Sequence, residues 1–171
     1  MRLALLSALA LTACTSIVPV TAMRLSGLSP TTADPADLAI DLKLPAGIDV
    51  SPGGAKMIFT VSRVDLGDTR NGQFALQRNG SVFMVNPADY AALRGLQAQA
   101  RTWQAENDDA TKGSLSINVS PCRIGDGPTN DARVDVAIRM QQDGAFLPLV
   151  QAGPLSAVTS PQQLRDMPDC P

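Results

Sequence analysis

The sequence predicts a mainly β domain with one central helix, an α+β fold built as an antiparallel β-sandwich or as a bent sheet with the helix packed on it. Three observations favour this class. Apolar and polar residues alternate in several separate segments, one segment between them changes to helical spacing, and Gly, Pro and Asn turns separate the segments. The alternation leaves one face of each strand polar, so the sheet should be mostly antiparallel with one face in water.

Period-two alternation marks the predicted strands, which cover residues 38–44, 57–62, 73–78, 114–120 and 133–141. Asn79-Gly80 is a strong hairpin signal and should join 73–78 to a strand over 81–85. Asp143-Gly144 should likewise turn the last of these strands into residues 145–150.

Two further segments are predicted as turns that bound strands. Pro52-Gly53-Gly54 should precede the strand over 57–62, and Asp65-Leu66-Gly67-Asp68 should follow it. Asn71-Gly72 should then come before the strand that carries Phe74.

The central helix should run from Asn86, which caps it, with Pro87 at its first position, to about Glu106. Its apolar side chains share one stripe at helical spacing, and they are Tyr90, Leu93, Leu96, Ala100 and Trp103. A second, short helix should begin behind the hydroxyl of Ser160 and run through Met167.

The first fourteen residues differ from the rest. Arg2 precedes a short apolar run, Leu3 to Leu11, which is too short to cross a membrane and is typical of a secretory signal. The run closes with Leu11-Thr12-Ala13-Cys14, which resembles the lipobox of bacterial lipoproteins.

The resemblance implies that residues 1–13 are a signal peptide removed before Cys14, whose thiol then carries a lipid. Residues 14–21 would be the lipidated cysteine and a tether, and residues 22–171 a single β-rich domain. Two or more acyl chains hold a protein stably at a membrane. Because Thr15, and not Asp, follows the cysteine, the resemblance implies the periplasmic face of the outer membrane.

Two alternatives for this segment stay open. Val20-Thr21-Ala22 also has the small residues that an ordinary signal peptidase accepts, and cleavage there would release a soluble periplasmic protein. Residues 3–23 could instead stay uncut as a weak membrane anchor.

Charge and composition argue against several classes of function. The net charge is −2 and the basic residues are scattered, so nucleic acid is not an expected partner. The chain has no histidine, which excludes Ser-His-Asp and Cys-His catalysis in their usual forms and His-ligated metal centres. The oxygen-bearing loop from Gly125 to Asp131 is more simply a turn than a calcium site. We therefore expect no enzymatic activity, no cofactor and no metal.

Cys122 and Cys170 remain once Cys14 is set aside. In an oxidising compartment such a pair is expected to form a disulfide, which would fasten the C-terminal tail. The bridge would close a long loop, worth about 4 kcal/mol in chain entropy.

The favoured function is a structural or protein-interaction role in a cell-envelope lipoprotein, with the membrane and an envelope protein as partners. An alternative is a module that binds a small or lipidic ligand in a cavity bordered by Tyr90, Leu93 and Trp103. A third is a secreted soluble protein or an enzyme with an Asp-based site.

Overall fold

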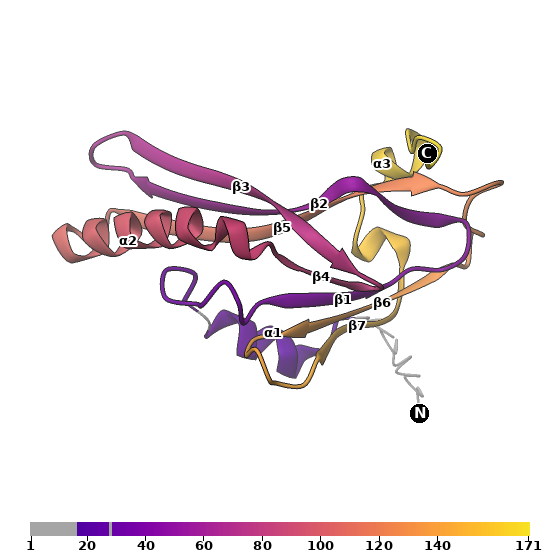
Figure 1. Ribbon diagram of the computed structural model, residues 1–171, viewed down its shortest axis with the longest axis horizontal. Helices are drawn as coiled ribbons and strands as arrows, with labels where there is room; N and C mark the ends of the chain where they lie inside the picture. Colours follow the sequence, from indigo (N-terminus) through magenta and orange to yellow (C-terminus); the bar gives the residue numbers. More distant parts are fainter. Residues whose placement is uncertain (1–16, 28) are drawn as a thin grey trace, which may run out of the picture.

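A computed structural model describes residues 17–27 and 29–171. The predicted signal peptide and the lipidation of Cys14 fall outside the described residues. Seven strands form one curled sheet in the order β5-β2-β3-β4-β1-β6-β7, and the long helix α2 packs within its curl (Figure 1). The predicted α+β class is confirmed, in its bent-sheet form.

The named strands all pair antiparallel. They are β1 (Ala39–Lys43), β2 (Ile48–Arg63), β3 (Asp68–Asn79), β4 (Val82–Val85), β5 (Thr111–Arg123), β6 (Arg133–Arg139) and β7 (Leu147–Pro154). The short β1 lies beside β4, the middle strand of the order, and its Ile40 is opposite Phe83 of β4 on one side and Ile138 of β6 on the other. The pairing of β1 with β4 therefore connects the two halves of the sheet.

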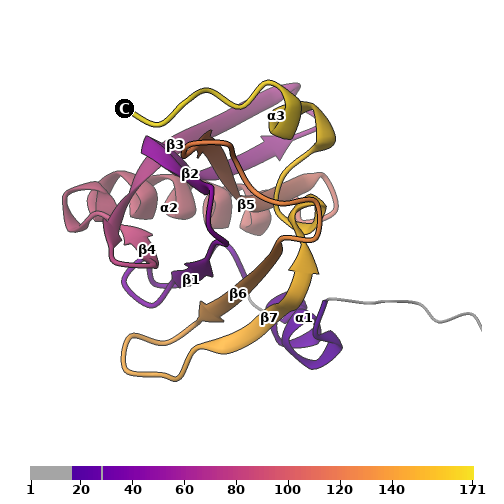
Figure 2. The same cartoon turned by 90° about the vertical axis from the view of Figure 1, so that its right-hand side faces the viewer.

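The two halves face each other across the hydrophobic core. One half contains β5, β2 and β3, and the other contains β1, β6 and β7 (Figures 1 and 2). β5 and β7 are the end strands of the order, so the sheet curls like a barrel without closing. On β5 the polar face carries Ser114, Ser116 and Asn118, which are exposed, so the predicted wet face of that strand is confirmed.

The predicted central helix is confirmed as a single 3₁₀ turn, η1 (Pro87–Asp89), followed by α2 (Tyr90–Glu106). The side chain of Asn86 accepts a hydrogen bond from the backbone N–H of Ala88 at 3.0 Å, as expected of an N-cap. Leu93, Ala100 and Trp103 are buried against the sheet.

The C-terminal segment is fastened as predicted. Ser160 forms a capping box with Gln163 at the start of α3 (Pro161–Arg165), which follows the 3₁₀ turn η2 (Leu155–Ala157). Cys122 and Cys170 form the expected disulfide, with their Cα atoms 4.9 Å apart.

The predicted hairpins around Asn79-Gly80 and Asp143-Gly144 are also present.

Two predicted strand limits are wrong. Pro52-Gly53-Gly54 is not a turn, because β2 runs through it with a bulge between Val50 and Ala55 opposite a continuous β5. Gly53 has a φ of +66°, a conformation that a bulge and a turn both use, so the local sequence does not distinguish them. Gly72 likewise lies inside β3 and pairs with Phe59, because the strand starts at Asp68.

A short helix, α1 (Pro19–Ser26), was not predicted. Ile17 forms an isolated bridge with Val150 of β7, and the N–H of Val18 donates to the carbonyl of Leu149 at 2.8 Å. The folded body thus includes residues that the sequence assigned to the tether over 14–21. Among the described residues, no helix is long and apolar enough to cross a membrane.

Candidate functional site

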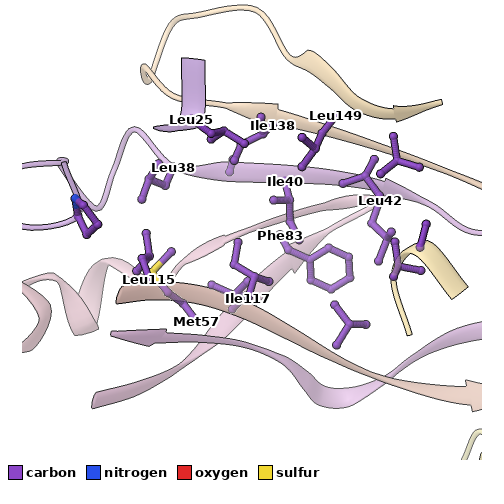
Figure 3. Close-up of a pocket in the computed structure, with 18 residues that line it drawn as sticks. Leu25, Leu38, Ile40, Leu42, Met57, Phe83, Leu115, Ile117, Ile138 and Leu149 are labelled. Atoms are coloured by element: carbon purple, nitrogen blue, oxygen red, sulfur yellow. The ribbon is translucent and has the colours of Figure 1, made fainter. Parts of the chain in front are cut away.

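An apolar cavity of about 460 Å³ lies between the two halves of the sheet (Figure 3). Its walls come from all seven strands of the sheet together with α1 and η2. The lining residues are all apolar, and they are Leu25, Pro30, Leu38, Ala39, Ile40, Leu42, Met57, Leu76, Phe83, Leu115, Ile117, Val119, Val136, Ile138, Leu149, Val150, Ala157 and Val158.

Burial separates a floor from a mouth. The floor residues are buried, and they come from β1, β2, β3, β4, β6 and β7 and the residue before β1, with Ile40, Met57 and Phe83 among them. The mouth is formed by lining residues that are only half-buried, among them Leu25 of α1, Ile117 of β5 and Leu149 of β7. The cavity therefore opens between the two edge strands, at the place where the sheet does not close.

The alternation of the strands builds this surface. On β5, Leu115, Ile117 and Val119 point into the curl while the serines between them face water. Ile117 lies opposite Met57 of β2 in the register, so both side chains are on the concave face. Figure 3 shows Leu115, Ile117 and Met57 on one side of the cavity and Ile40, Ile138 and Leu149 on the other.

The chemistry of the cavity follows from its lining. Among the described residues that line the cavity, none has a hydroxyl, amide, carboxylate or basic group in its side chain. A polar group placed inside would lose its hydrogen bonds to water without replacement, which is strongly unfavourable. A hydrocarbon chain loses nothing of the kind and gains dispersion contacts with the walls. The site is therefore suited to binding apolar matter.

The three residues that the sequence suggested for ligand binding lie elsewhere. Leu93 and Trp103 are part of the buried core beneath α2, and Tyr90 is half-buried with the guanidinium of Arg94 5.6 Å from its ring centre. None of them lines the cavity. The sequence signal for the actual lining was the apolar face of each strand, including Leu115 and Ile117, which periodicity alone assigns to core.

Apart from the apolar cavity, a cluster of ion pairs lies at the tip of the β2–β3 hairpin. The buried guanidinium of Arg63 donates to Asp65 at 2.8 Å and to Glu106, at the end of α2, at 2.6 Å. These hydrogen bonds, above all the one with Asp65, raise the pKa of Arg63, and Arg63 in turn lowers the pKa of Asp65. The pairs stiffen the hairpin tip (residues 64–67), on which Val64 and Leu66 are exposed.

The loop from Gly125 to Asp131 is a turn region with two glycines at positive φ, as its composition predicts. The pKa of Asp131 is lowered, first by a hydrogen bond from the side chain of Thr129 and then by its own backbone N–H. Within the described part of the chain, no group of three or more Cys, Asp or Glu residues is placed to hold a metal ion.

Comparison of the chain with protein-family models, with curated proteins and with solved structures finds no match in any of the three.

Proposed function

We propose that this protein is a lipid-anchored component of a bacterial cell envelope that binds the hydrocarbon chain of a lipid in the cavity of its curled sheet. The observation that carries the proposal is the lining of the cavity, to which eighteen of the described residues contribute, every one of them apolar. The lipid anchor is the expectation from the sequence at Cys14.

The size of the cavity supports a ligand. Protein interiors pack as densely as organic crystals and contain few voids larger than a water molecule. An apolar cavity of about 150 Å³ is already enough to bind a benzene ring. At about 460 Å³ this cavity is well above that size and falls in the usual range of small-molecule sites, roughly 300–1,000 Å³.

The position of the mouth supports a lipid rather than a compact apolar molecule. The buried floor offers no partner to a polar head group, so a bound lipid would insert its chain and leave its head group in water beyond Leu25 and Ile117. Binding of this kind selects for the length and shape of the chain and is indifferent to the chemistry of the head group.

Titration with cis-parinaric acid, an 18-carbon fatty acid whose emission rises in apolar surroundings, tests the proposal. Ile117→Trp places a large side chain in the mouth, and Ser116→Trp places the same side chain on the wet face of the same strand. Wild type and Ser116→Trp should bind the probe, and Ile117→Trp should weaken binding by about tenfold or more, the effect of losing one buried large apolar contact. Equal binding by the two variants, or none by the wild type, would refute a chain-binding cavity.

Folding of both variants is checked by circular dichroism and by the retention of the Cys122–Cys170 disulfide. If Ile117→Trp does not fold, Ile117→Phe is the smaller replacement with the same expected direction. Mass spectrometry of the protein purified without added lipid should also find a bound lipid released by organic solvent.

A structural or protein-interaction role is the second candidate, and one observation favours it. Val64 and Leu66 are exposed on a hairpin tip that the Arg63 ion pairs hold in place. Rigid apolar side chains of this kind are typical of contact sites between proteins. A photo-crosslinking residue at position 66 in living cells should give one discrete product with an envelope protein, and one at Ser116 should give none. Identical patterns from the two positions would argue against this role.

A further inference from the structure

Three of the exposed large apolar residues lie within seven positions at the start of the described chain. They are Ile17, Val20 and Met23, and about half to two thirds of each residue's surface is exposed. The others, such as Val64 and Leu66 at the hairpin tip, lie on distant parts of the molecule (Figure 1). We call Ile17, Val20 and Met23 the α1 patch.

The two sides of α1 have different surroundings. Thr21 is buried against the body, and Leu25 on the same side forms part of the cavity mouth. Val20, Met23 and Arg24 are exposed on the opposite side. Because residues three and four apart share a helix face, Val20 and Met23 present one apolar surface with a basic residue beside it.

The α1 patch is fixed to the cavity mouth. Ile17 bridges Val150 of β7, and Val18 donates a hydrogen bond to Leu149 at 2.8 Å. Leu149 and Val150 both line the cavity. The segment that carries the patch is therefore bonded directly to one wall of the cavity, and Figure 2 shows α1 lying along β7.

The expected anchor limits where this surface can be. Cys14 precedes Ile17 by three residues. Three extended residues span at most about 11 Å. If Cys14 carries acyl chains in a bilayer, Ile17, the first residue of the patch, lies within about this distance of the head groups, and α1 follows directly behind it.

We propose that the α1 patch lies against the lipid bilayer, with Val20 and Met23 in the interface and Arg24 at the lipid phosphates. Short helices with an apolar face and a flanking basic residue bind membranes in this way, and the contact strengthens with buried apolar area and with anionic lipid. The docking does not depend on the cavity binding a ligand.

The docked orientation places the mouth of the cavity at the membrane surface. A lipid chain could then pass between bilayer and cavity along Leu25 without crossing bulk water. The docking rests on the proposed anchor at Cys14, and this consequence rests in addition on the proposed binding of a lipid chain in the cavity.

Site-specific fluorescence on the full-length protein, purified in detergent and reconstituted into phosphatidylethanolamine–phosphatidylglycerol vesicles, tests the docking. Met23→Cys and Leu66→Cys are labelled separately with the environment-sensitive dye NBD. The two positions are a matched pair, because Met23 is 66 % exposed and Leu66 is 63 % exposed. The disulfide occupies Cys122 and Cys170, and a lipidated Cys14 does not react with the dye.

Dye at position 23 should shift to shorter wavelength in vesicles, and lipids spin-labelled near the head group should quench it by about twofold or more, as expected of an interfacial group. Dye at position 66 should keep the emission of a group in water. Water-like emission at position 23, or no binding of the protein to vesicles, would overturn the proposal. Dye uptake by the wild type would reveal a free Cys14 and overturn the anchor on which the placement depends.

A charge variant separates docking from ligand binding. Val20→Glu with Met23→Glu should reduce the quenching of a dye placed at Ile17→Cys to what the Cys14 tether alone gives, while cis-parinaric acid binding in detergent stays unchanged, and quenching equal to that of Ile17→Cys alone would overturn the docking. Quenching at position 23 together with failure of the wild type to bind the fatty acid would leave the docking standing and reject the cavity function.

Discussion

Arg63 and Glu106 join the β2–β3 hairpin to the end of α2, with 2.6 Å between Nη1 of the arginine and Oε2 of the glutamate. Arg63 is the only charged side chain that is buried in the described part of the chain, and Glu106 is the single glutamate of the sequence. The guanidinium also donates from Nε and Nη2 to both oxygens of Asp65, at 2.8 and 3.1 Å. The guanidinium of Arg63 therefore donates hydrogen bonds to two carboxylates, Asp65 in the hairpin and Glu106 at the end of α2.

Arg63→Lys should destabilise the protein almost as much as Arg63→Ala. A lysine ammonium cannot reproduce the fork that reaches Asp65 in bidentate fashion and Glu106 at the same time. Both variants should lower the melting temperature by several degrees in a calorimetric scan. Glu106→Gln, which removes a charge from the more exposed partner, should have the smaller effect. Full stability in Arg63→Lys would show that only the charge matters.

Stability should be nearly constant between pH 5 and 8 and should fall below about pH 4. The chain has no histidine, the side chain that ordinarily titrates in the first interval. The hydrogen bond from Arg63 lowers the pKa of Asp65 below its ordinary value of 3.8. A depressed folded-state pKa gives stability that is present above the unfolded value and is lost as the pH falls through the folded one.

Urea unfolding at pH 7, 5 and 3 measures this dependence. Asp34 should contribute in the same direction, because the backbone N–H of Ala36, and then Arg94, hold its pKa low. Asp65→Asn should flatten the decline between pH 5 and 3, and an unchanged decline would show that the Arg63 pair is not its source.

Gly72→Ala should destabilise the protein by about 1–3 kcal/mol, the usual effect of overpacking a core. A Cβ atom at Gly72 would lie 2.6 Å from Cδ1 of Leu96 on α2 and 2.8 Å from the ring of Phe74. In the Leu96→Ala background the penalty of the added methyl group should shrink, and a double-mutant cycle from urea unfolding gives the coupling. Gly95→Ala on the same helix meets no other atom and should instead stabilise by about 0.5–1 kcal/mol.

Replacing Cys122 and Cys170 by alanine should lower the free energy of unfolding by about 4 kcal/mol, because the bridge restricts a loop of 48 residues in the unfolded chain. The tail should also exchange its amide hydrogens faster, since Cys170 donates to the carbonyl of Arg123 at 2.8 Å only while the two segments are held together. Chemical reduction of the wild type should reproduce both effects. A loss below about 1 kcal/mol would mean that the hydrogen bonds and the Arg123–Asp169 ion pair hold the tail by themselves.

Features decided by neighbours in sequence were predictable. Asn86 and Ser160 cap helices because a short polar side chain reaches its own backbone, and Asn79-Gly80 forms a hairpin because its residues tolerate the required turn. The disulfide was predictable because only two cysteines remained after Cys14.

Features decided by distant contacts were not predictable. Leu96 of α2 lies against Gly72 and leaves no room there for a side chain. β2 continues through the bulge at Gly53 because β5 pairs with it on both sides. The cavity depends on the separation of the two sheet halves, which no single strand encodes. Alternation could therefore place Ile117 on an inward face, and could not show that this face borders empty space.

The position of β1 has a consequence for how the chain acquires its fold. Residues 39–41 pair on one side with 82–84, and residues 39–43 pair on the other side with 135–139, so the pairing of β1 with β6 joins segments nearly a hundred residues apart. Contacts of such long sequence separation slow folding, because the loop must be closed before the contact forms. In a chain still being synthesised, β1 cannot pair along its whole length with β6 until residue 139 has emerged, and the sheet is complete only after β7 has followed.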